Sequence, residues 1–163
     1  MVKTVLWKVL EKPVPQAGKE WMSKLEERGY RPCDWNKNIF SRMSTPDKGL
    51  VWPIPCMRVS LGDLGFTGPT RLSEFYKKAR EEGLENPPPL AAVLLRMVYD
   101  EQPVGEWLRI ATAMDAMIDS DGIPHLPKLG HALGNFYLHT YWSYPDAIFH
   151  PTNEFVMVDR RLN

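Results

Sequence analysis

The spacing of apolar residues predicts two amphipathic helices in the first half of the chain. In residues 16–28 the apolar side chains recur at helical intervals, and Gly29 follows as a typical C-terminal residue. In residues 69–82 they recur in the same way, Pro69 stands at the first helical position, and Gly83 follows the end. We therefore expect these two segments to be the main helices.

The rest of the first half shows no helical period. Residues 1–10 are rich in Val and Leu and predict a strand, although a short helix fits as well. Residues 30–49 have no clear period and predict a long, partly ordered loop with room for a short helix. Residues 50–61 predict an extended segment, because Pro53 and Pro55 are incompatible with a helix interior.

The second half begins at three consecutive prolines, residues 87–89, and predicts an antiparallel meander. The expected strands are residues 93–99, 106–114, 123–129, 135–142 and 154–159. Residues 91–97 fit a short helix equally well. We predict one α+β domain over residues 1–163, with a mostly antiparallel sheet packed with two main helices. Residues 1–86 form its mixed half and residues 87–163 its β-meander half.

Alternation in the first expected hairpin points to a binding surface. If residues 93–99 pair with 106–114, Arg96 lies opposite Arg109 and beside Trp107 on one face. Like charges opposite one another are unfavourable in a sheet, so a carboxylate, water or a bound anion should offset them. Arginine is suited to bidentate contacts with carboxylate or phosphate.

Residues 135–142 also alternate and place polar aromatic side chains on one face. In a continuous sheet this stripe shares the face of the first hairpin. The candidate ligand or partner surface comprises Arg96, Trp107, Arg109, Tyr137, His139 and Tyr141. Two alternatives remain: local carboxylates pair with the arginines, or the N-terminal helices cover the stripe.

Charge is balanced over the whole chain, with 20 Lys+Arg and 20 Asp+Glu. This excludes a strongly basic nucleic-acid coat and an acidic disordered tail. Residues 1–86 nevertheless carry a net charge of +4 and residues 87–163 a net charge of −4. The opposed charges favour packing of the two halves on each other, or one half facing a charged partner.

The two cysteines, Cys33 and Cys56, are too few for a disulfide framework or a metal site of their own. We expect reduced thiols, although one long-range bridge remains open for an exported chain. Lys3 and Lys8 interrupt the apolar N-terminal residues, and no apolar run reaches the length of a membrane span. We therefore expect a soluble, cytoplasmic protein without a membrane partner.

Two alternatives involve other chemistry. All four histidines lie between residues 125 and 150, with aspartates nearby, and suggest a metal-dependent or histidine-based hydrolase, for example with a His139–Asp146 pair. Their spacing matches no named ligand pattern, so we expect no metal or cofactor. Residues 28–58 mix basic and aromatic side chains, as in single-stranded nucleic-acid binding. Our leading hypothesis is a small binding or regulatory protein, without catalysis of its own, whose arginine-aromatic face binds an acidic ligand or protein partner.

Overall fold

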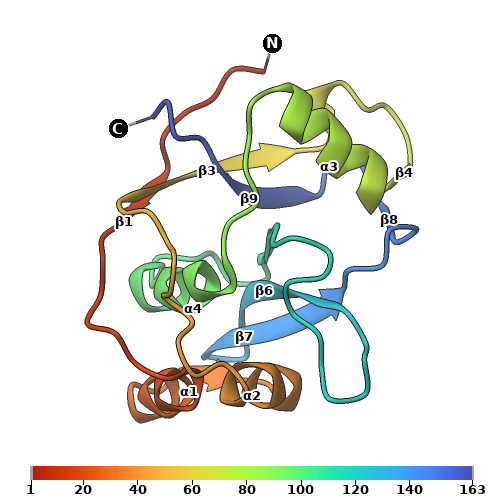
Figure 1. Ribbon diagram of the computed structural model, residues 1–163. Coiled ribbons are helices and arrows are strands. Elements are labelled where there is room, and N and C mark those ends of the chain that lie inside the picture. Colours follow the sequence, from red (N-terminus) through yellow and green to blue (C-terminus); the bar gives the residue numbers. More distant parts are fainter. Residues whose placement is uncertain (1, 163) are drawn as a thin grey trace.

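A curled, mixed sheet organises the computed structural model, which describes residues 2–162 (Figure 1). Within those residues the seven strands of this sheet run in the order β1-β3-β9-β5-β6-β7-β2. They are β1 (Lys8–Leu10), β2 (Arg31–Pro32), β3 (Ile54–Ser60), β5 (Trp107–Ile110), β6 (His125–Ala132), β7 (Asn135–Trp142) and β9 (Glu154–Val158). A second sheet pairs β4 (Thr70–Arg71) with β8 (Ile148–Phe149).

The described part of the chain forms four α-helices and one short 3-10 helix at Gly62–Leu64. The α-helices are α1 (Gly18–Glu27), α2 (Asp34–Ser41), α3 (Leu72–Glu81) and α4 (Pro89–Val98). α1 and α3 confirm the two helices predicted from apolar spacing, but α3 begins at Leu72. Pro69 is therefore not at its first position, because Thr70–Arg71 form β4. The expected loop over residues 30–49 contains β2 and α2. Within residues 2–162, no helix combines the length and apolar character that a membrane crossing requires.

The expectation of a mostly antiparallel sheet with two main helices holds only in part. β5, β6 and β7 form an antiparallel meander, as predicted. However, β5 pairs with β9 in parallel, and β2 pairs with β7 in parallel. These pairs are possible because long excursions of the chain separate the partner strands, as parallel pairing requires.

The strand predicted at residues 93–99 is wrong, and the alternative of a short helix at residues 91–97 is confirmed, because this segment belongs to α4. Pro89 occupies a first-turn position of this helix, where its fixed φ is favourable. The side chains from Leu90 to Arg96 are all buried. A helix surrounded by protein is apolar on every side, so it shows no periodic polar face that would distinguish it from a buried strand.

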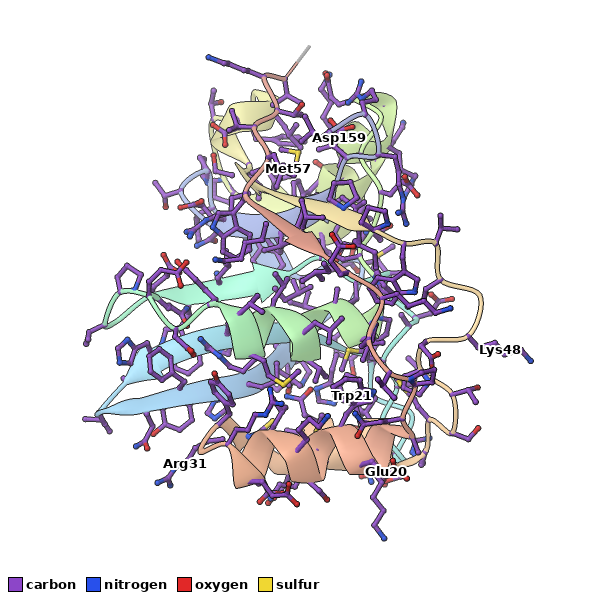
Figure 2. All side chains as sticks on the ribbon, turned by 90° about the vertical axis from the view of Figure 1, so that its left-hand side faces the viewer. Glu20, Trp21, Arg31, Lys48, Met57 and Asp159 are labelled. Atoms are coloured by element: carbon purple, nitrogen blue, oxygen red, sulfur yellow. The ribbon has the colours of Figure 1, made fainter. Side chains whose placement is uncertain are left out.

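The sheet separates two apolar cores. α4 packs inside the curl, where its side chains meet Leu108, Leu129 and Leu138 of the central strands. α1 and α2 close that end of the molecule, and α3 covers the opposite face at the other end (Figure 1). Figure 2 shows Trp21 of α1 near one end of the molecule and Met57 of β3 toward the other.

Ion pairs join the positively charged first half to the negatively charged second half. Arg58 of β3 lies 3.0 Å from both Glu106 and Glu154. Lys8 lies 2.7 Å from Glu101. Strands from the two halves also share one sheet, because β9 of the second half pairs with β3 of the first half and β7 pairs with β2. The two halves therefore pack on each other, and some of their opposite charges form ion pairs across the contact.

Candidate functional site

The face of β5, β6 and β7 that points away from α4 carries most of the predicted surface. Trp107 pairs with Gly130, which pairs with Tyr137 on the next strand. Arg109, Lys128 and His139 form the neighbouring row. Directly paired residues share one face of a sheet, so both rows project to the same side. Their side chains, and that of Tyr141, are partly exposed. We refer to Trp107, Arg109, Lys128, Tyr137, His139 and Tyr141 as the open face.

A stack of aromatic rings forms the first row of the open face. Trp107 stacks on Tyr137 with 6.1 Å between ring centroids, and its centroid lies 5.3 Å from that of His139. The ring lies against Gly130, where an added Cβ would come within 2.2 Å of a Trp107 ring atom. The missing side chain at Gly130 therefore allows the indole to lie flat on the sheet.

Two cations without carboxylate partners lie next to this stack. The Nζ atom of Lys128 is 4.9 Å from the Trp107 ring centroid. The Arg109 guanidinium lies 5.5 Å from the ring of Tyr141. No ion pair among residues 2–162 includes Arg109 or Lys128. The Nε atom of Arg109 is buried and, within the same residues, has no hydrogen-bond partner.

Burial and mutual repulsion destabilise the charged forms of this row. Burial lowers the pKa of Lys128, and Arg109 lowers it further. Burial also lowers the pKa of Arg109. For His139, burial and then Lys128 lower the pKa, which favours the neutral imidazole. A bound anion would attract these cationic groups and offset their mutual repulsion. The open face is therefore electrostatically suited to a negative ligand.

The predicted location of Arg96 on this face is wrong. Arg96 lies on α4, fully buried on the opposite side of the sheet. Its guanidinium donates to Gln102 Oε1 at 2.8 Å and to the carbonyl oxygens of Tyr99, Gly130 and Tyr137. Burial lowers the pKa of Arg96 to about 10, so it remains charged at neutral pH. Arg96 thus supports the backbone beneath the open face.

Sequence reasoning missed Lys128 and Gly130, because the register between the strand predicted at residues 123–129 and the strand at 135–142 was not predicted, and Gly130 lies beyond the predicted end. β6 extends to Ala132 and meets β7 through a two-residue turn, Leu133–Gly134. Both turn residues have positive φ, of 52° and 76°. Asn-Gly is the usual signal for such a turn, and leucine rarely adopts positive φ. Gly134 was the one local sign of the hairpin in the sequence. A two-residue turn at Leu133–Gly134 sets the β6–β7 register in which Lys128 pairs with His139.

A second polar group lies beyond the open face, at the other end of β6 and β7. His125 Nε2 is 2.8 Å from Asp119 Oδ2, and His125 Nδ1 is 3.0 Å from Thr140 Oγ1. Asp119 and His125 are buried. Trp35 of α2 lies over the imidazole, with ring centroids 5.3 Å apart. Trp35 and Trp142 are 48% and 56% exposed and wall two pockets that share His125.

The four histidines do not converge. His131 Nδ1 contacts the carbonyl oxygen of Gln102, and His139 belongs to the open face. His150 lies in the turn before β9, where its backbone N–H donates to Asn153. Within residues 2–162, no group of three His, Cys, Asp or Glu side chains could hold a metal ion. The histidine that is hydrogen-bonded to an aspartate is His125, and its partner is Asp119, in place of the His139–Asp146 pair suggested by the sequence.

The basic and aromatic side chains of residues 28–58 are dispersed over several elements. Arg58 is bound by two glutamates of the second half. Tyr30 donates to Asp100 at 2.6 Å, and Arg42 donates to the carbonyl oxygen of Ile118. Cys33, at the start of α2, and the buried Cys56 of β3 are both free thiols.

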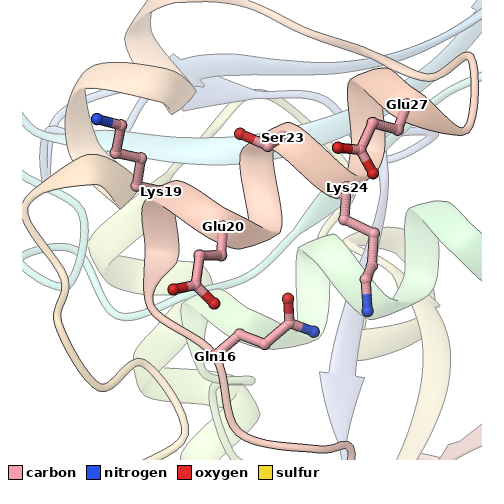
Figure 3. Close-up of a pocket in the computed structure, with 6 residues that line it drawn as sticks. All are labelled: Gln16, Lys19, Glu20, Ser23, Lys24 and Glu27. Carbon is pink, nitrogen blue, oxygen red and sulfur yellow. The ribbon is translucent and has the colours of Figure 1, made fainter.

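The outer side of α1 carries another hollow, of about 330 Å³ (Figure 3). It is lined by Gln16, Lys19, Glu20, Ser23, Lys24 and Glu27. Its cationic and anionic side chains alternate along one exposed helix surface, which is typical of a solvated face. The two lysines and two glutamates of this hollow balance in charge, so it has no electrostatic preference for a cationic or an anionic ligand.

Comparisons with known proteins found no matching family model, no similar curated protein and no similar solved structure.

Proposed function

We propose that this protein binds a small anionic ligand with a planar group on the open face. The observation that supports it most directly is the pair Arg109 and Lys128. They are register partners on adjacent strands, partly buried, and without a carboxylate within residues 2–162. By contrast, Arg58 on the same sheet is bound by two glutamates. A carboxylate, sulfonate or phosphate group would supply the missing counter-charge.

The aromatic stack supports a planar group on the ligand. Trp107, Tyr137 and His139 present ring surfaces beside the two cations. Aromatic rings bind other flat rings by offset or tilted stacking. The negative group would lie over Arg109 and Lys128 while the planar group contacts Trp107. Binding of this kind needs no catalytic group.

Benzenesulfonate is a suitable probe, because it is planar and its charge does not change between pH 5 and 9. We expect it to quench or shift the fluorescence of Trp107 and to release heat in isothermal titration calorimetry. A charge-assisted hydrogen bond contributes about 1.5–3 kcal/mol, so Arg109→Gln or Lys128→Gln should weaken binding roughly ten-fold or more. Arg80→Gln, at an exposed arginine of α3, is the matched control and should leave affinity unchanged.

Three results would contradict the proposal. They are no binding at millimolar benzenesulfonate, equal affinity of the Arg109→Gln variant and the wild type, and equal weakening by Arg80→Gln. Polyglutamate provides a further comparison, since an acidic protein partner would resemble it. Binding of polyglutamate without binding of benzenesulfonate would overturn the small-ligand proposal in favour of a protein partner.

A further inference from the structure

The hydrogen-bonded chain Asp119–His125–Thr140 has a defined direction of proton donation. Asp119 Oδ1 accepts the backbone N–H groups of Asp121 at 2.8 Å and Ile123 at 3.0 Å. Burial alone would raise the pKa of Asp119, but these hydrogen bonds and the one from His125 lower it overall. Asp119 is therefore an ionised, acceptor-only group.

The ionised aspartate determines which nitrogen of His125 carries the proton. Because Asp119 can only accept, His125 Nε2 must donate to it across 2.8 Å. In the neutral ring Nδ1 is then the acceptor, and the group 3.0 Å away is the hydroxyl of Thr140. Thr140 must donate its proton to His125. An acid, an imidazole and a hydroxyl in this order are the arrangement that activates a hydroxyl nucleophile.

Thr140 is accessible from a pocket. It lines a cavity of about 260 Å³ together with Lys128, His125 and Tyr141, between Trp35 and Trp142. A second cavity, of about 430 Å³, lies on the Asp119 side and shares His125 and both tryptophans. β2 pairs only with Tyr137 and Leu138 of β7, so Thr140 lies beyond the end of that pairing. The partly exposed Thr140 thus has open space on one side and the buried imidazole on the other.

From this geometry we propose that Thr140 is the nucleophile of an acyl-transfer site that hydrolyses esters with an apolar or aromatic group. Its Oγ1 forms a bond to the ester carbonyl carbon while its proton passes to His125 Nδ1. The ester C–O bond then breaks, and the leaving alkoxide takes that proton as an alcohol. Water attacks the acyl-threonine, gives a proton to His125, and releases the carboxylic acid as Thr140 Oγ1 takes the proton back.

Other side chains of the pocket have roles that follow from their chemistry. Trp35 and Trp142 provide the apolar walls that hold the ester group. Asp119 is a positioning residue, because it acts on the substrate only through His125. The proposal is independent of anion binding on the open face, because Thr140 pairs with Pro127 and projects from the face of the sheet opposite Lys128.

The test is covalent labelling of the full chain with a biotinylated alkyl fluorophosphonate. The hydroxyl of an activated serine or threonine forms a P–O bond with this probe and releases fluoride. We expect one adduct, mapped by mass spectrometry to Thr140. Thr140→Ser keeps the hydroxyl and should retain labelling, whereas the isosteric Thr140→Val should lower it at least ten-fold. Thr45→Val, at an exposed threonine, is the control and should label like the wild type.

The variants also separate catalysis from structure. Asp119→Asn should lower labelling roughly 100-fold and alter its pH profile, which a loss of packing alone does not predict. An unlabelled wild-type chain under conditions that label a known serine hydrolase overturns the proposal. An adduct on another residue also overturns it, as does labelling of Thr140→Val at the level of the wild type. Benzenesulfonate binding by Thr140→Val shows whether the open face survives, so this proposal and anion binding can fail separately.

Discussion

Substitution of Gly130 by alanine tests the packing that shapes the open face. The added Cβ would lie 2.2–2.4 Å from three ring atoms of Trp107, well inside any contact distance. The backbone of β6 is held between β5 and β7, so the indole must move away. Its contacts with Tyr137, His139 and Lys128 are then lost or weakened.

The expected cost follows from those contacts. An aromatic pair contributes about 0.5–1.5 kcal/mol, and Trp107 has two such partners. The cation–π contact with Lys128 adds about 0.5–1 kcal/mol. Alanine regains about 0.5–1 kcal/mol over glycine in a strand, since the unfolded chain is less flexible. We therefore expect Gly130→Ala to lower the free energy of unfolding by about 1–3 kcal/mol.

Urea denaturation measures this change as a lower midpoint with an unchanged m-value. A double-mutant cycle identifies its cause. In a Trp107→Ala background the ring is absent, so Gly130→Ala should become neutral or stabilising. Equal destabilisation in both backgrounds would refute the reasoning, as would a Gly130→Ala chain as stable as the wild type. Gly130→Ala should also weaken benzenesulfonate binding, because the stacking surface is displaced.

Two further predictions concern the groups beneath and on the open face. Arg96→Met removes the guanidinium that donates to the carbonyl oxygens of Tyr99, Gly130 and Tyr137, so the free energy of unfolding should fall by at least about 3 kcal/mol. In urea titrations, the exposed Arg80→Met should change it by no more than about 0.5 kcal/mol, and equal effects would contradict this role. Folding lowers the pKa of His139, so the unfolded chain binds the proton more readily and acidification removes stability. From pH 8 to 5 the thermal midpoint should fall less in His139→Gln than in the wild type; parallel curves would exclude this contribution.

Acidification should have the opposite effect on ligand affinity: it lowers folding stability but strengthens binding of the anion. An anion over the open face favours protonated His139, so benzenesulfonate should bind more tightly as the pH falls toward 5, with proton uptake. Calorimetry in two buffers of different ionisation enthalpy measures that uptake directly. Affinity independent of pH, or proton release on binding, would show that His139 does not contact the bound anion.

Local pattern in the sequence was sufficient for several elements. The helical spacing in residues 16–28 and 69–82 identified α1 and α3, because each buries one face and exposes the other. The alternation in residues 135–142 correctly grouped Tyr137, His139 and Tyr141 on one face of β7. The same period placed Trp107 and Arg109 together on β5, since successive side chains of a strand point to opposite sides.

Only the tertiary structure determined which residues of neighbouring strands lie next to those faces of β5 and β7. The sequence alone determined that Trp107 and Arg109 share a side, but only strand pairing added Lys128 and Gly130 to them. Arg96 was misplaced because an apolar run has no period once all its surroundings are protein, so only the folded chain distinguishes α4 from a strand. The contact between His125 and Thr140 likewise depends on strand pairing. Local preference acts within a few residues, whereas the convergence of side chains depends on which strands pair, and that is determined by burial of the whole chain.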